Sequence, residues 1–133
     1  MDRLFLDANV LFSAAYREGS PLQRLWHRPQ TELLTSAYAV LEAERHLLAD
    51  QRARLAELLK RVRIVPDVGS DGLPGRDVVR AKDVPILAAA VAAGATHLIT
   101  GDRRDFGSYF GKKLAGVWIV PPRDYLSTVK GRS

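Results

Sequence analysis

Four acidic residues stand where strand-like runs end or where helical segments begin: Asp7, Asp83, Asp102 and Asp105. A fifth, Glu42, lies on the helical segment that follows the second strand-like run. Asp7 directly follows an apolar run over residues 4–6, and Asp102 comes two residues after a run over residues 97–100. In open parallel sheets, ligands bind beyond the carboxyl ends of the strands. We therefore expect these carboxylates to gather at one edge of a sheet.

Carboxylates that converge without matching cations repel one another and raise one another's pKa values. Hard divalent cations resolve that repulsion, because Mg²⁺ and Mn²⁺ take oxygen ligands and leave positions for water and phosphate. One or two such ions can lower the pKa of a bound water and stabilise the attacking and leaving oxygens of phosphodiester cleavage. The pattern favours metal-assisted chemistry on a phosphodiester.

Each acid also has a purely structural explanation. Asp7 and Asp83 suit helix N-caps, a role worth about 1 kcal/mol. Asp102 follows Gly101 and suits a turn, while Asp105 suits a solvated helix start. Only their expected position at one edge of one sheet distinguishes a site from a set of caps and turns.

Short apolar runs alternate with helical segments along the chain. The runs predict strands at residues 4–6, 32–35, 62–65, 97–100 and 117–120. Helices are expected at residues 7–15, 22–26, 36–48, 51–60 and 83–91 and near residues 125–126, with a loop over residues 67–76. The alternation is typical of an α/β fold with a parallel sheet, and the length predicts a single domain over residues 1–133.

Several aromatic and basic residues are interpreted as structural. Trp26 and Trp118 are expected in the core, since large aromatic side chains usually serve packing. His97 is also expected to be structural, because the three histidines lack the spacing of a zinc site. The basic and aromatic segment 109–113 is interpreted as a solvated loop.

The composition favours a polyanionic partner. The net charge is +5, and 15 arginines, the better bidentate phosphate ligands, outnumber 5 lysines, although a GC-rich genome would favour Arg as well. Cysteine is absent, which excludes disulfides and thiolate metal sites. No apolar run approaches the roughly 18 residues of a membrane span, and acids come too early for a secretory signal, so we expect a cytoplasmic protein.

Four segments occur in an order and spacing that resembles the PIN domain family. They are Leu4–Leu11 with Asp7-Ala8-Asn9, Thr35–Glu42, Asp83–Ala95 with its Ala-rich helix, and Leu98–Phe106. The last contains Thr-x-Asp-x-x-Asp-Phe, the most distinctive of these motifs, and residues 122–126 resemble the family's final strand-to-helix step. The resemblance covers nearly the whole chain.

The resemblance implies a three-layer α/β/α fold around a parallel sheet of order 3-2-1-4-5. It also implies a Mg²⁺- or Mn²⁺-dependent endoribonuclease, frequently a VapC-type toxin that an antitoxin neutralises. By motif position, Asp7, Glu42, Asp83 and Asp102 would be the catalytic and metal-binding quartet, with Asp105 a supporting metal ligand. Asn9, Ser36 and Thr100 would orient the quartet or its waters.

Two assignments depend on local position. Glu44 falls in the apolar stripe of its helix and is by periodicity the more sheltered acid, whereas Glu42 matches the motif spacing from Ser36, and we favour Glu42. Arg103 and Arg104 stand between two proposed ligands, so we expect them to face the backbone of an RNA substrate.

We predict a homodimeric ribonuclease toxin with RNA as substrate and a cognate antitoxin as protein partner. One alternative is a noncatalytic PIN-fold module that binds nucleic acid or protein. Another is a structure-specific nuclease in RNA processing or DNA repair. Metal titration separates an enzyme from a binding module, while the RNA target and the number of metal ions stay open at this point.

Overall fold

A computed structural model describes residues 1–74 and 76–128 of the chain. Within these residues one sheet is formed by β1 (Asp2–Leu6), β2 (Thr31–Ser36), β3 (Arg63–Val65), β4 (His97–Ile99), β5 (Lys112–Leu114) and β6 (Val117–Val120). The strand order is β3-β2-β1-β4-β6-β5, and every neighbouring pair is parallel except β5 with β6. The predicted order is confirmed, since the fifth predicted strand, now β6, pairs with β4.

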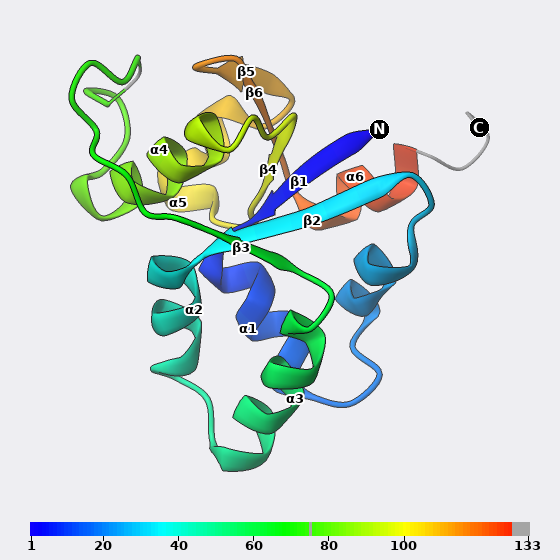
Figure 1. Ribbon diagram of the computed structural model, residues 1–133. Helices are drawn as coiled ribbons and strands as arrows, with labels where there is room; N and C mark the ends of the chain where they lie inside the picture. Colours follow the sequence, from blue (N-terminus) through cyan, green and yellow to red (C-terminus); the bar gives the residue numbers. More distant parts are fainter. Residues whose placement is uncertain (75, 129–133) are drawn as a thin grey trace.

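Helices flank the sheet on both sides. In Figure 1, α1 (Ala8–Tyr16), α2 (Ala37–Glu44) and α3 (Ala49–Leu59) lie below the strands and α4 (Val84–Ala92) lies above them. Shorter elements complete the chain: η1 (Pro21–His27), η2 (Ala81–Asp83), α5 (Arg103–Phe106), η3 (Gly107–Tyr109) and α6 (Pro122–Thr128). The predicted α/β class with flanking helical layers is confirmed. No helix of the described ranges combines the length and the apolar character that crossing a membrane requires.

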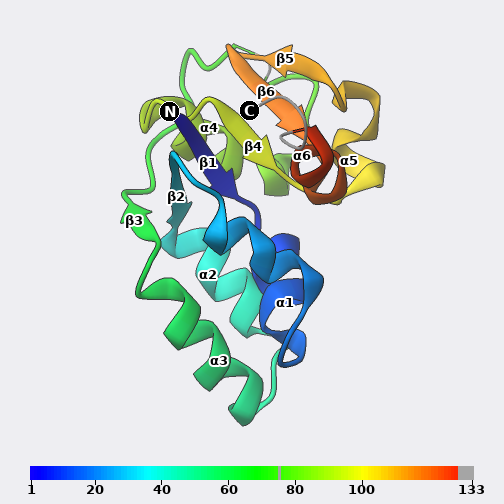
Figure 2. The same cartoon turned by 90° about the vertical axis from the view of Figure 1, so that its right-hand side faces the viewer.

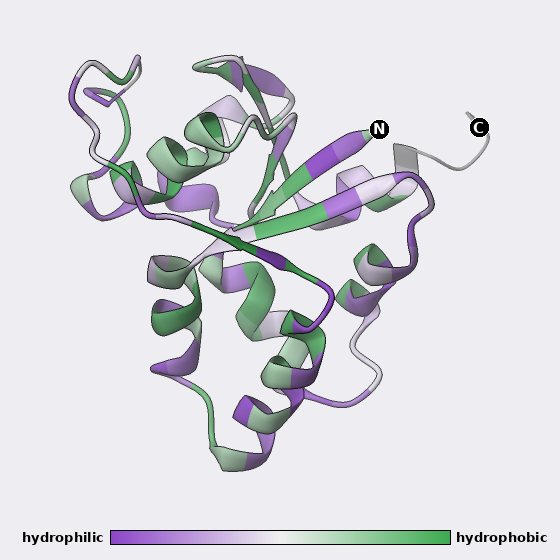
Figure 3. Cartoon of the chain, in the orientation of Figure 1, coloured by the Kyte–Doolittle hydropathy of each residue, from purple (hydrophilic) through white to green (hydrophobic). Residues whose placement is uncertain are grey.

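The central strands are buried because helices cover both of their faces. Leu4, Phe5 and Leu6 of β1 are fully buried, and Figure 3 shows the inner halves of β1 and β2 as the apolar centre of the sheet. Leu87 and Ala90 of α4 are also fully buried. This core holds the carboxyl ends of β1, β2 and β4 in fixed positions, and the candidate site is built on them.

The predicted helix over residues 36–48 is too long. Ser36 does cap α2, accepting a hydrogen bond from the Ala39 amide at 3.2 Å, but α2 ends at Glu44. The chain then turns, so that Leu47 is buried and Leu48 is 70% exposed. Gln51 accepts from the Leu48 amide at 2.8 Å and so begins α3. This local side-chain bond supports a new helix start where the apolar spacing alone indicated a continuous one.

The segment interpreted as a solvated loop contains an edge strand. Leu114 of β5 pairs with Val117 of β6, and the two residues between them, Ala115 and Gly116, have φ of 54° and 83°. Positive φ at both positions matches the two-residue hairpin turn that antiparallel strands favour. Trp118 of β6 is 40% exposed, with the Lys113 ammonium 5.1 Å from its ring centre, so the prediction of a core Trp118 is wrong.

Candidate metal centre

The carboxyl end of β1 places Asp7 in a hydrogen-bond network with Thr100, which follows the neighbouring strand β4. Asp7 is buried and caps α1, with its Oδ1 accepting from the Ala8 amide at 2.7 Å. The Thr100 hydroxyl donates to Asp7 Oδ2 at 2.8 Å. Because β1 and β4 pair in parallel, these two residues meet at the same edge of the sheet.

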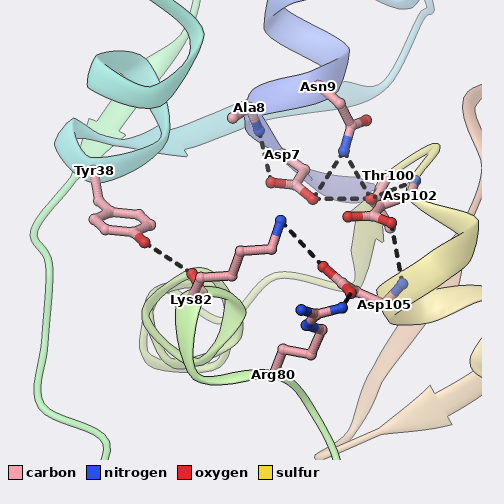
Figure 4. A network of polar contacts seen from close by, with 9 residues as sticks. All are labelled: Asp7, Ala8, Asn9, Tyr38, Arg80, Lys82, Thr100, Asp102 and Asp105. Carbon is pink, nitrogen blue, oxygen red and sulfur yellow. Dashed lines mark hydrogen bonds and ion pairs between the residues drawn. The ribbon is translucent and has the colours of Figure 1, made fainter. Parts of the chain in front are cut away.

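Asn9 links Asp7 and Thr100 to the loop after β4 through hydrogen bonds (Figure 4). Its Nδ2 lies 3.2 Å from both Asp7 Oδ2 and Thr100 Oγ1, and its Oδ1 accepts from the Gly101 amide at 2.9 Å. Thr100 Oγ1 also accepts from the Asp102 amide at 3.2 Å. Asn9 and Thr100 therefore hold Asp7 and the Asp102 loop in one arrangement.

Three further acids meet beside this network. Carboxylate oxygens of Asp83, Asp102 and Asp105 lie within 4.8 Å of one another. Asp102 caps α5, since its Oδ1 accepts from the Asp105 amide at 3.0 Å. Asp83 occupies the N-cap position of α4 as predicted, but its carboxylate makes no side-chain capping bond.

The oxygens of two of these acids are short of donors. Asp83 Oδ2 and both carboxylate oxygens of Asp105 are buried with no hydrogen-bond partner in residues 1–74 and 76–128. Asp105 does form ion pairs, at 3.4 Å with Arg80 and at 3.3 Å with Lys82 (Figure 4). The Tyr38 hydroxyl donates to the Lys82 carbonyl oxygen at 2.9 Å and steadies that segment. Buried polar atoms ordinarily have partners, so the bare oxygen of Asp83 suits a cation ligand.

A hollow of about 340 Å³ opens over these residues, and we call it the acidic hollow. Its polar lining comprises Asp7, Asn9, Tyr38, Glu42, His46, Lys82, Asp83 and Asp102. Ala8, Phe12, Ala43 and Ile86 form its apolar wall. The hollow therefore joins residues from α1, α2, α4 and the loop after β4, and it leaves room for a small ligand above the carboxylates.

Burial and mutual repulsion change the protonation of the acids. Burial above all, and then the neighbouring Asp105 and Asp7, raise the pKa of Asp83 to about 8. The proton that Asp83 retains, together with Lys82, holds the pKa of Asp105 at about 2. Burial also raises the pKa of Asp7, although the Thr100 hydrogen bond opposes the change. Without a metal ion the site thus keeps one proton on an acid that would otherwise be ionised.

Comparison with known proteins identifies the family. Residues 3–104 match the sequence profile of the PIN domain. The chain belongs to the PIN domain family. Among solved structures, it resembles a chain of VapBC2 from Rickettsia felis bound to a DNA fragment from their promoter, with a TM-score of 0.63 and 12% identity over 90% of this chain and 98% of that one. At that identity the likeness shows the fold alone. No curated protein sequence matches the chain.

In this PIN domain Glu42 and Glu44 occupy different places. Glu42 lines the acidic hollow and pairs with Arg45 at 3.2 Å, whereas Glu44 is not among the lining residues. Ser36 caps the helix that carries Glu42 but does not itself line the hollow. Its hydroxyl therefore supports the start of the helix that carries Glu42.

The two arginines predicted to contact RNA are both exposed, but they lie differently. Arg103 lines a second hollow, and Arg104 lines neither this hollow nor the acidic one. Sequence reasoning missed Lys82 and Arg80, which neutralise Asp105. No local pattern marks them, since their importance depends on η2 packing beside α5.

Proposed function

We propose that this PIN domain is a metal-dependent endoribonuclease. The observation that carries the proposal is the meeting of Asp83, Asp102 and Asp105 within 4.8 Å, beside a hollow that Asp7 and Glu42 also line. Such a group of carboxylates is destabilising unless a cation or a proton neutralises it. The net charge of the whole chain, +5, favours a polyanionic substrate.

The donor set fits Mg²⁺ or Mn²⁺, which prefer carboxylate oxygens. Asp7, Glu42, Asp83 and Asp102 would hold the ion or ions, with Asp105 in support. When bound, such an ion activates a water and neutralises charge that develops on the phosphate oxygens.

The chain's own residues prepare the site for that chemistry. Asn9 and Thr100 orient Asp7, which keeps one ligand in place before an ion arrives. Lys82 lines the same hollow and offers positive charge toward a phosphate. The apolar wall with Phe12 and Ile86 limits the water around the carboxylates, which strengthens their attraction to a cation.

We further propose that the substrate is RNA and that the protein is the toxin of a toxin–antitoxin pair. The motif order and the fold shared with the VapBC2 chain support this assignment. A cognate antitoxin, a homodimeric state, a cytoplasmic location and a single domain over residues 1–133 belong to the same proposal. Growth arrest on expression, relieved by coexpressing the protein encoded by the adjacent reading frame, is the expected result.

The ribonuclease proposal is tested by Asp102→Asn. Asn caps a helix about as well as Asp, so the bond to the Asp105 amide should persist while the anionic ligand is lost. We expect wild-type protein with Mn²⁺ to cut a generic single-stranded RNA. The variant should be slower by a factor of at least roughly 100, with an unchanged melting temperature in EDTA.

Calorimetry supplies the control for this test. Mn²⁺ should bind the wild type and raise its melting temperature, because an ion that binds only the folded state stabilises it. Absence of binding at millimolar Mn²⁺, together with no cleavage, would leave the noncatalytic binding module as the better assignment.

A further inference from the structure

A second hollow, of about 540 Å³, is lined by the residues on either side of Asp102, and we call it the flanking hollow. The two hollows are lined by consecutive residues of the chain. Asp102 lines the acidic hollow, and its neighbours Gly101 and Arg103 line the flanking hollow. Its volume lies within the roughly 300–1,000 Å³ of small-molecule sites. The segment after β4 therefore contributes residues to both hollows.

The topology brings the segments that line the flanking hollow to the edge of the sheet that carries the acids. β4 and β6 pair in parallel, and the Thr100 amide donates to the Val120 carbonyl oxygen at 3.1 Å. The segments after these strands, α5 and α6, therefore leave the same edge of the sheet (Figure 2). Pro121 and Pro122 follow β6 at this edge and form one wall of the flanking hollow.

The walls of the flanking hollow are largely apolar. Leu22 of η1 and Phe110 face the hollow together with the two prolines. Unpaired nucleobases bind to such surfaces, because every base has a flat π-face that stacks on aromatic and apolar side chains. The lining thus suits a base better than it suits an ion or a small polar metabolite.

Positive charge lies at the rim. Arg103 of α5 and Arg123 of α6 line the flanking hollow and are exposed, and neither guanidinium has a hydrogen bond or ion pair within the described ranges. By contrast, Arg63, Arg76 and Arg80 are each paired with an acid. Asp124 is the acid of the lining, so the two arginines leave a surplus of one positive charge.

We propose that the flanking hollow binds one nucleotide of a single-stranded RNA, next to the phosphate held at the acidic hollow. The base packs against Phe110 and Pro121, and Arg103 and Arg123 bind the adjoining phosphates. This inference rests on the proposed ribonuclease function and adds the side of the site along which the RNA chain is held. It also separates Arg103, which contacts the nucleotide, from Arg104, which lines neither hollow.

The test measures binding of a fluorescein-labelled single-stranded RNA hexamer in EDTA by fluorescence anisotropy, where no cleavage occurs. Arg103→Ala and Arg123→Ala should each raise the Kd about three- to tenfold and lower the log–log salt slope by roughly one. Arg104→Ala and Arg17→Ala should each change the Kd less than about twofold, since the exposed Arg17 follows the far end of α1 and bears the same charge.

A further variant tests the proposed contact between Phe110 and the base. Phe110→Leu keeps an apolar side chain but removes the ring, and should raise the Kd about fivefold or more while the salt slope stays unchanged. Melting temperatures show that each variant folds. Titration of the wild type with a nucleoside monophosphate should shift the amide resonances of Gly101, Gly107 and Phe110 in preference to the rest of the spectrum.

Equal Kd values for the Arg103, Arg123, Phe110 and Arg17 variants would overturn the proposal, as would binding of a protein segment but no RNA at this hollow. Cleavage with Mn²⁺ distinguishes its failure from that of the ribonuclease assignment. If the wild type cuts RNA but the variants bind normally, only the flanking hollow has been assigned wrongly. If the variants weaken binding but the wild type never cuts, nucleotide binding stands and the ribonuclease does not.

Discussion

Asp83→Asn isolates the electrostatic state of the site, because Asp83 makes no capping bond and its Oδ2 has no hydrogen-bond partner in the described ranges. The pKa of Asp83 is raised from 3.8 to about 8 by burial and by the neighbouring acids. Between these two values the folded protein retains a proton that the unfolded chain has lost. Without metal, the free energy of unfolding should therefore fall as the pH rises through this range.

The magnitude follows from the pH interval. While only the folded state keeps the proton, each rise of one pH unit lowers the free energy of unfolding by about 1.4 kcal/mol. From pH 5 to pH 7 the largest possible loss is therefore about 3 kcal/mol. Water at the mouth of the hollow and the nearby Lys82 ammonium reduce this loss, and we expect the free energy of unfolding to fall by about 1–3 kcal/mol. Asn cannot ionise, so the variant has no such proton to lose as the pH rises. The stability of the variant relative to wild type should rise by that amount over the interval.

Urea unfolding in EDTA at pH 5, 6 and 7 measures the difference, with the exposed Asp67→Asn as control. Groups that titrate elsewhere affect both proteins equally and cancel. Mn²⁺ at pH 7 should then stabilise the wild type and not Asp83→Asn, because the ion replaces the proton as the neutralising partner. If the difference between the two proteins does not change from pH 5 to pH 7, Asp83 is ionised throughout, and the reasoning about the metal-free site is refuted.

Three smaller changes examine other parts of the fold. Thr100→Val should cost about 1–3 kcal/mol in urea unfolding, because the buried Asp7 oxygen loses a donor, and an unchanged stability would contradict the network. Lys82→Met should tighten Mn²⁺ binding severalfold in calorimetry by removing a competing cation, and a weaker affinity would show that Lys82 assists the ion instead. Burial lowers the pKa of His97, so the wild type should lose stability as the pH falls below 6.5, and His97→Gln should lose less over the same range.

Local sequence patterns determined most of the architecture. The apolar run at residues 4–6 is part of a strand because side chains buried on both faces of a parallel sheet must all be apolar. Asp7 and Ser36 cap the helices that follow their strands, which requires only short-range geometry. Since strand ends of a parallel sheet share one edge, the same patterns predicted where Asp7 and Asp102 would lie.

Tertiary packing decided which neighbours these acids have. The choice between Glu42 and Glu44 depends on the phase and the end of α2, and two residues on one helix differ by more than half a turn, which apolar spacing does not resolve. The pKa of Asp83 is raised because Asp83 is buried and because α5 places Asp105 beside it, although 22 positions separate the two acids. The flanking hollow exists only because α5 and α6 leave adjacent strands. Such contacts join residues far apart in the chain, and their distances are set by how helices pack on the sheet, which no local pattern encodes.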